Sequence, residues 1–287
     1  MPRLALLLTT FIWGATFPAT KVALEQMPPL SFLSLRFFIG TLLIAVWFLT
    51  TGYRLRRESG VLSASAVATV FLFFGYVLQT VGLHYTSASN SAFLTALYVI
   101  IVPLILRRFD RRVIAATVIA TAGLWLLVKP SATVNFGDIM TIGCAVAFAG
   151  HIVCLERYTR LFDAPSLLLW QMSAMTTLFL PMMLWEQAPA DAFVPSPALL
   201  IGLTVTGVFA TGAFAVQMWA QQLIPAQQVA LIFASEPAYA AWLSWYFLGE
   251  TLDLQGWFGS GLILTAVLIG AFVAPSPQPV AGATEPV

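Results

Sequence analysis

Residues 30–51 read LSFLSLRFFIGTLLIAVWFLTT, an almost unbroken apolar run that holds one charged residue, Arg36. A helix rises about 1.5 Å per residue, so a run of this length crosses a hydrocarbon core roughly 30 Å thick. Ten such runs fill the chain almost from end to end, so the sequence predicts an all-α polytopic membrane protein with ten transmembrane helices. The ten runs are Leu4–Leu24, Leu30–Thr51, Ala64–His84, Ser87–Leu106, Val113–Lys129, Asp138–Glu156, Ser166–Trp185, Ala198–Trp219, Ala226–Leu248 and Leu254–Ala274.

The composition and the placement of basic residues agree with this class. Hydrophobic residues make up 60% of the chain and charged residues 9%, too few for the surface of a soluble domain of this size. Arginines gather at the N-terminus and in the even-numbered loops, whereas the opposite side carries only Lys21 and Lys129. By the positive-inside rule, we expect both termini to be cytoplasmic. We expect the first span to be retained, and residues 275–287 to form a disordered cytoplasmic tail.

An internal repeat relates the two halves of the chain. A shift of 138 residues aligns the third to fifth spans with the eighth to tenth and pairs Gln79 with Gln217. A shift of 135 residues aligns the first two spans with the sixth and seventh. Because five spans is an odd number, the second half enters the membrane from the opposite side. The sequence thus predicts two inverted five-helix repeats, residues 1–135 and 136–274, which is a common plan of secondary transporters.

Several short motifs stand out in the first two and the last two spans. They are Trp13-Gly14 with Phe17 and Lys21, Arg36-Phe37, the segment from Ala230 to Glu236-Pro237, Phe247-Leu-Gly-Glu250, and Gln255-Gly-Trp257 with Gly259 and Gly261. With them the chain resembles, over its whole length, the EamA-type branch of the drug/metabolite transporter superfamily, and closely resembles the YddG-type exporters of aromatic amino acids. The resemblance implies a basket with spans one to four and six to nine around a central cavity. It places the fifth and tenth spans at the periphery of the basket. It also implies that the protein lies in the bacterial inner membrane.

Glu236 lies near the middle of its span, where an ionised carboxylate is expensive. It must therefore face a cavity or a partner, or carry a proton, and Phe233 shares its helical face. Two interpretations stay open. The carboxyl contacts a substrate amine or titrates during transport, or it supports the backbone where Pro237 removes a hydrogen bond. The equivalent positions of the first half hold Tyr98 and Val99, so an acidic role applies to one half only.

Gln79 and Gln217 occupy matching positions in the two halves, and Tyr76 and Phe214 lie one turn before them. A buried amide needs hydrogen-bond partners, which the α-carboxylate and α-amine of a substrate could supply. Each half would then offer an aromatic ring and an amide to one substrate. The alternative is that the amides only join helices to each other.

The fourth span carries a polar stripe of Ser91, Thr95 and Tyr98 on an otherwise apolar segment. Such a stripe faces protein or water rather than lipid. It lines a cavity, or its small hydroxyls let helices pack closely.

Three further candidates come from the first, second and sixth spans. Trp13 and His151 lie on helices that the resemblance places around the cavity, and His151 is a proton acceptor or a satisfied core residue. Arg36 lies deep in the second span, where it holds an anionic group or anchors the hairpin.

These features favour a secondary transporter that exports amino acids, aromatic and other apolar ones, and related small metabolites by alternating access. The alternatives are an exporter of other amphipathic metabolites or drugs, an intramembrane enzyme, and a passive pore. We expect no enzymatic activity, no cofactor and no metal, and the chain has no G-x-x-x-x-G-K-[ST] nucleotide loop. The expected partners are a small-molecule substrate and the lipid bilayer, with neither nucleic acid nor nucleotide.

Overall fold

The computed structural model describes residues 1–128, 135–249, 251 and 253–272, and every regular element in these residues is a helix. The expected tail, 275–287, and Lys129 lie outside the described residues. The elements are α1 (Pro2–Ala23), α2 (Pro29–Thr51), α3 (Val61–Tyr85), α4 (Ala88–Thr95), α5 (Tyr98–Leu106), α6 (Arg111–Val128), α7 (Phe136–Leu161), α8 (Ala164–Glu186), the short 3-10 helix η1 (Ala190–Phe193), α9 (Pro197–Leu203), the π-helical segment η2 (Thr204–Phe209), α10 (Ala210–Gln221), α11 (Ala226–Phe233), α12 (Glu236–Leu248) and α13 (Leu254–Phe272).

Each predicted run coincides with one helix or with consecutive helical segments. Six of these stretches, among the described residues, are long and apolar enough to cross a membrane by length and composition. They are α2, α3, α4 with α5, α7, α8, and α9 through α10. The prediction of an all-helical, polytopic membrane protein is confirmed for this part of the chain, and the number of ten crossings stays a prediction.

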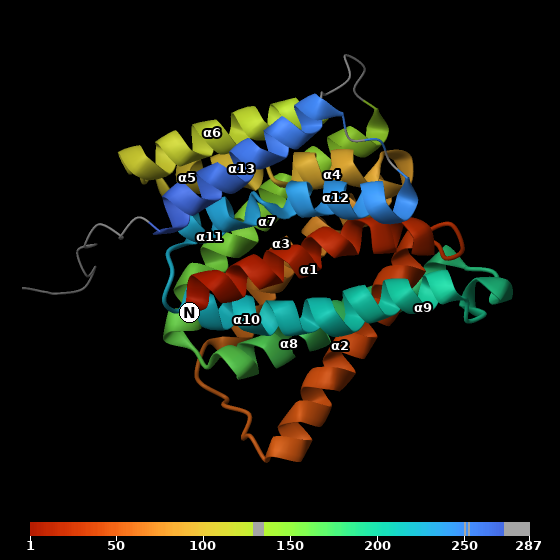
Figure 1. Cartoon of the computed structure of the whole chain (residues 1–287). Helices are drawn as coiled ribbons and strands as arrows, with labels where there is room; N and C mark the ends of the chain where they lie inside the picture. The colour runs from red at the N-terminus through yellow and green to blue at the C-terminus, as the bar shows by residue number, and fades with distance from the viewer. Residues whose placement is uncertain (129–134, 250, 252, 273–287) are drawn as a thin grey trace, which may run out of the picture.

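The helices form a bundle in which helices of the first half of the chain pack beside helices of the second half (Figure 1). α6 packs along α13 at one edge, and α2 packs along α8 at the other. α3 packs along α7, and α1 lies in the middle against α10 and α12. Glycines let α3 and α7 interlock: a Cβ on Gly75 would lie 2.4 Å from the Phe148 ring, and one on Gly150 would lie 2.5 Å from the Phe71 ring.

The fourth and ninth predicted spans are each broken in the middle. α4 ends at Thr95 and α5 begins at Tyr98, whereas α11 ends at Phe233 and α12 begins at Glu236. This corrects the expectation that Ser91, Thr95 and Tyr98 form a stripe on one continuous helix. It also means that Phe233 and Glu236 lie on either side of a break.

A tighter backbone turn, not proline alone, makes each break. The N–H of Leu97 donates to the carbonyl of Leu94 at 3.2 Å, and the N–H of Ser235 donates to that of Ile232 at 3.1 Å. Both bonds join residues three apart, the 3-10 spacing that tightens a helix locally. Pro237 accompanies the second break, but the first forms without a proline at the matching position.

A polar contact joins the loops at the end of the bundle where most arginines lie. The Tyr53 hydroxyl donates to Asp163 Oδ1 at 2.6 Å, and the Ser166 N–H donates to Asp163 Oδ2 at 3.0 Å. Arg56 Nε lies 3.7 Å from the same carboxylate. Burial raises the pKa of Asp163, but these hydrogen bonds and the arginine charge outweigh it and hold the pKa below its ordinary value.

Candidate substrate site

A narrow cavity lies in the middle of the bundle, between α1, α3, α7, α10 and the two broken helices. Its volume is about 40 Å³, roughly three times the ~10–15 Å³ that a cavity needs to hold one water molecule. Ten of the twelve predicted site residues line it. The lining residues are Trp13, Thr16, Leu72, Tyr76, Gln79, Thr95, Tyr98, Phe148, His151, Ile152, Phe214, Gln217, Phe233 and Glu236.

Aromatic rings from six helices form much of the cavity wall. The Trp13 ring centroid lies 5.3 Å from that of Phe214 and 4.7 Å from that of Phe233. The Tyr76 centroid lies 5.3 Å from that of Phe148 and 6.3 Å from that of Phe214. These are the edge-to-face and tilted geometries that aromatic pairs prefer. The rings thus offer a continuous apolar surface to a bound molecule.

The buried carboxyl of Glu236 is held by a phenol from the other half of the chain. The Tyr98 hydroxyl donates to Glu236 Oε2 at 2.9 Å, between residues 138 positions apart. The sequence shift of 138 residues pairs these two positions, and in the structure they contact each other. The hydrogen bond stabilises a carboxyl group away from water, and it places that group at the cavity wall beside both helix breaks.

Two buried polar atoms in the cavity wall have no hydrogen-bond partner within the described part of the chain. They are the indole Nε1 of Trp13, a donor, and the Oε1 of Gln217, an acceptor. Gln217 is fixed in place because its Nε2 donates to Gln221 Oε1 at 2.8 Å. Buried polar groups in proteins are normally satisfied. An open donor and an open acceptor on one cavity wall therefore suit a polar ligand.

Gln79 and His151 line the cavity, and each contacts one polar side chain among the described residues. Gln79 Nε2 donates to Thr95 Oγ1 at 3.3 Å. His151 Nε2 lies 2.8 Å from the side-chain amide nitrogen of Gln171. Among the described residues, no group of three histidine, cysteine or acidic side chains lies close enough together to hold a metal ion.

Arg36 and Ser91 lie outside the cavity lining. The Arg36 guanidinium packs 4.4 Å from the Tyr76 ring centroid and 5.1 Å from that of Phe37, so it sits one layer behind the wall. Its Nη2 donates to the Tyr76 hydroxyl at 3.4 Å. Ser91 is fully buried, and its hydroxyl has no hydrogen-bond partner in the described residues.

Sequence reasoning missed four lining residues: Thr16, Leu72, Phe148 and Ile152. Two of them carried a usable signal. The sequence shift of 135 residues pairs Phe148 with Trp13, and Thr16 follows Trp13 by three residues on the same helical face. Leu72 and Ile152 resemble every other core aliphatic in the chain, so only the packed structure distinguishes them.

The chain matches the model of the EamA-like transporter family twice, over residues 2–129 and over residues 135–271. It therefore belongs to the EamA-like transporter family, and it is a membrane transporter with many membrane passes. The family resemblance inferred from the motifs is confirmed at this level.

Three relatives carry the same kind of name. An "Uncharacterized transporter" of Archaeoglobus fulgidus is 33% identical over 93% of this chain and 84% of the relative. The "Uncharacterized transporter YwfM" of Bacillus subtilis is 28% identical over 98% of this chain and 97% of the relative. The "Uncharacterized inner membrane transporter YedA" of Escherichia coli K12 is 30% identical over 37% of this chain and 34% of its own length.

A solved structure shares the fold. It is titled only "Crystal structure of protein", and it superposes with a TM-score of 0.76 over 93% of this chain and 94% of that chain. The two sequences are 15% identical. At that identity the likeness speaks for the fold alone.

Proposed function

We propose that the protein exports amino acids with aromatic or other apolar side chains, and related small metabolites, across the bacterial inner membrane by alternating access. The observation that carries the proposal is the chemistry of the central cavity. Aromatic rings line much of the wall, and three of its polar groups match a zwitterion. The Trp13 N–H suits a substrate carboxylate, and Gln217 Oε1 with the Glu236 carboxyl suits a substrate ammonium group.

Contacts between repeat partners support the inverted-repeat arrangement, with halves at residues 1–135 and 136–274. Two residues related by a two-fold axis touch each other only where they lie close to that axis. Tyr98 and Glu236 are 138 positions apart and share a hydrogen bond. Thr41 and Thr176 are 135 positions apart, and their hydroxyls lie 2.9 Å from each other. Both shifts are those that align the two halves of the sequence.

The ring contacts repeat in the same way. Trp13 of the first half packs on Phe214 of the second at 5.3 Å, and Phe148 of the second half packs on Tyr76 of the first, also at 5.3 Å. The shifts of 135 and 138 residues carry one pair into the other. The two helix breaks are likewise 138 positions apart, and discontinuous helices at a substrate site are typical of inverted-repeat transporters.

The cavity size supports a carrier rather than an open pore. A cavity of about 40 Å³ has room for only a few water molecules, so we expect the helices to move apart to admit an amino acid. A carrier makes this movement alternately toward each side, whereas a passive pore stays continuous across the membrane. The charge pattern of the loops supports cytoplasmic termini, and the name of the Escherichia coli relative supports an inner-membrane location.

A binding measurement on the purified protein tests the substrate class. A ligand that binds only the folded state at 100 times its Kd stabilises that state by about 2.7 kcal/mol, which raises the melting temperature. We expect phenylalanine, tyrosine or tryptophan to raise the melting temperature. We expect phenethylamine, which lacks the carboxylate, and 3-phenylpropionate, which lacks the amine, to leave it unchanged. Equal stabilisation by all of these compounds would favour an exporter of general amphipathic molecules.

A further inference from the structure

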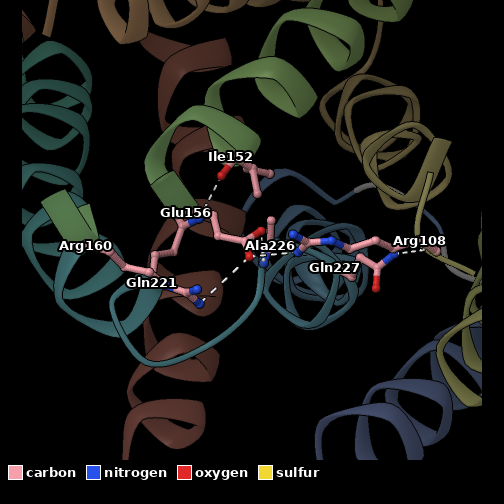
Figure 2. A network of polar contacts seen from close by, with 7 residues as sticks. All are labelled: Arg108, Ile152, Glu156, Arg160, Gln221, Ala226 and Gln227. Atoms are coloured by element: carbon pink, nitrogen blue, oxygen red, sulfur yellow. Dashed lines mark hydrogen bonds and ion pairs between the residues drawn. The ribbon is translucent and has the colours of Figure 1, made fainter. Parts of the chain in front are cut away.

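Glu156 joins three helices (Figure 2), one turn beyond the cavity-lining residue Ile152. Its Oε1 accepts a hydrogen bond from Arg108 Nη1 at 3.0 Å, just beyond the end of α5. Its Oε2 accepts one from the backbone N–H of Ala226 at 3.1 Å, at the first residue of α11. Arg160 Nη2 approaches Oε1 at 3.8 Å. The carboxylate thus ties the end of α7 to the ends of α5 and α11.

Two glutamines lie beside this cluster, as Figure 2 shows, and Gln227 is the one that bonds to a residue of it. Gln221 Nε2 donates to the carbonyl of Ile152 at 2.8 Å, and Gln227 Nε2 donates to the carbonyl of Arg108. Gln221 also accepts the hydrogen bond from Gln217, whose Oε1 is open in the cavity wall. A chain of hydrogen bonds therefore runs from the cavity to the α10–α11 junction.

A second cluster closes the opposite end of the bundle with the opposite charge. Lys21 Nζ donates to the carbonyls of Leu83 and Thr86 at 2.8 and 2.7 Å, at the α3–α4 junction. The shift of 135 residues carries Lys21 into Glu156, and the shift of 138 residues carries the α3–α4 junction into the α10–α11 junction. The positively charged Lys21 therefore binds backbone carbonyls, whereas the negatively charged Glu156, at the matching position, binds a backbone N–H. Each charge is opposite to the partial charge of the backbone group that it contacts.

The repeat also relates a second contact in each cluster. Arg3 Nη2 donates to Gln228 Oε1 at 3.3 Å, at the end where Glu156 lies. At the other end, Asn90 Nδ2 donates to Asp138 Oδ1 at 2.5 Å. The shift of 135 residues carries Arg3 into Asp138, and that of 138 residues carries Asn90 into Gln228. Each end thus has one charged residue from α1 and one from α7, and Arg108 adds a third at the end where Glu156 lies.

We infer that these two clusters are the gates of the transport path. The inner clasp consists of Glu156, Arg108 and Arg3, and the outer clasp of Lys21 and Asp138. The inner clasp holds the α10–α11 junction in place at one end of the cavity. The outer clasp holds the α3–α4 junction in place at the other end. Both clasps are closed in this structure, which agrees with a cavity of about 40 Å³. Opening one clasp at a time exposes the cavity to one side, so the inference rests on the proposed alternating access but not on the substrate.

Labelling a cavity cysteine from each side tests the gates without any substrate. Thr16→Cys, in a chain whose Cys144 and Cys154 are replaced by serine, reports access to the cavity in vesicles of known orientation. We expect Glu156→Gln to raise the rate of labelling by an impermeant thiol reagent at least about fivefold from its own end. We expect Lys21→Gln to raise it by a similar factor from the opposite end.

Asp163→Asn is the matched control. Its side chain lies at the same end as Glu156 and is equally exposed, 9% in both cases, but it joins loops rather than the α10–α11 junction. We expect this variant to change labelling from neither side. If Glu156→Gln fails to assemble, Arg108→Gln removes the same ion pair and should act from the same end. Increases from the same side for the glutamate and lysine variants, or no change in either, would overturn the inference. A failed search for amino acid transport would leave these labelling results intact.

Discussion

At the residue scale, the Tyr98–Glu236 pair combines a structural contact with a group that can exchange a proton. The hydrogen bond of 2.9 Å holds the carboxyl at the cavity wall. Glu236→Gln keeps an acceptor for the Tyr98 hydroxyl but cannot titrate. We therefore expect this variant to fold and to exchange substrate for substrate, but to lose the response of net export to an imposed pH gradient. Flux into vesicles with and without the gradient measures this.

Tyr98→Phe serves as the control for that variant, because it removes the hydrogen bond and leaves the carboxyl in place. We expect it to keep the pH response. A Glu236→Gln protein with normal net flux and a normal pH response would remove Glu236 from the mechanism.

Gln217 should contribute more to transport than to stability. Its open Oε1 would bind the substrate, and losing such a hydrogen bond should raise the half-saturating concentration roughly 2- to 10-fold. Hydrogen bonds between membrane helices contribute about 0.6 kcal/mol on average. The free energy of unfolding of Gln217→Ala should therefore lie within about 1 kcal/mol of that of the wild type. We expect Gln79→Ala to behave in the same way. Gln222→Ala, which follows α10 outside the cavity lining, should transport normally. Normal transport by both cavity variants would show that the amides are structural.

Sequence reasoning located the residues around the cavity better than it assigned their contacts. Polar and aromatic side chains are conspicuous in apolar spans, so Gln79, Gln217 and Glu236 could be found by eye. The bond between Tyr98 and Glu236 could not, because the repeat alignment pairs the two positions without showing that they touch. Arg36 was equally conspicuous, but its guanidinium is covered by the Tyr76 ring and does not line the cavity.

At the element scale, the packing of α6 on α13 depends on a glycine contact far from the cavity. A Cβ on Gly259 would lie 2.5 Å from the carbonyl oxygen of Gly123 and 2.6 Å from the backbone nitrogen of Leu127. Backbone atoms cannot yield without separating the helices. Gly259→Val should therefore destabilise the protein by about 1 to 3 kcal/mol while transport persists at low temperature.

Gly261 supplies the control for this prediction. It lies on the same helix, and a Cβ there would meet nothing within 4 Å. Gly261→Ala should leave the melting temperature in detergent almost unchanged. Equal losses of stability in the two variants would contradict the packing of α6 on α13.

The helix breaks show where sequence patterns fail at this scale. The ten apolar runs are visible because lipid demands long apolar segments, but the breaks at Leu97 and Ser235 leave no gap in hydropathy. Pro237 marks one of them, and nothing in the sequence marks the other. Breaks inside a bundle are possible because neighbouring helices, rather than lipid, surround the freed backbone groups.

At the scale of the whole molecule, the arginine asymmetry predicts the orientation in the membrane. Phe109 and Ala190 are exposed and lie in loops that the asymmetry places on opposite sides. In a chain without other cysteines, an impermeant thiol reagent applied to intact cells should label Ala190→Cys and not Phe109→Cys. The reverse pattern would invert the orientation. Labelling of both from outside would contradict a fixed topology.

The central claim, that one cavity carries an amino acid by alternating access, is tested most directly by counterflow. Liposomes that contain the protein are loaded with unlabelled phenylalanine and diluted into a trace of labelled phenylalanine. A carrier exchanges the two, so we predict that labelled phenylalanine rises transiently above its equilibrium level and that the initial rate saturates with concentration. Uptake that rises linearly with concentration and shows no overshoot would contradict the account. An overshoot only with substrates that lack the α-amino and α-carboxyl groups would contradict it as well.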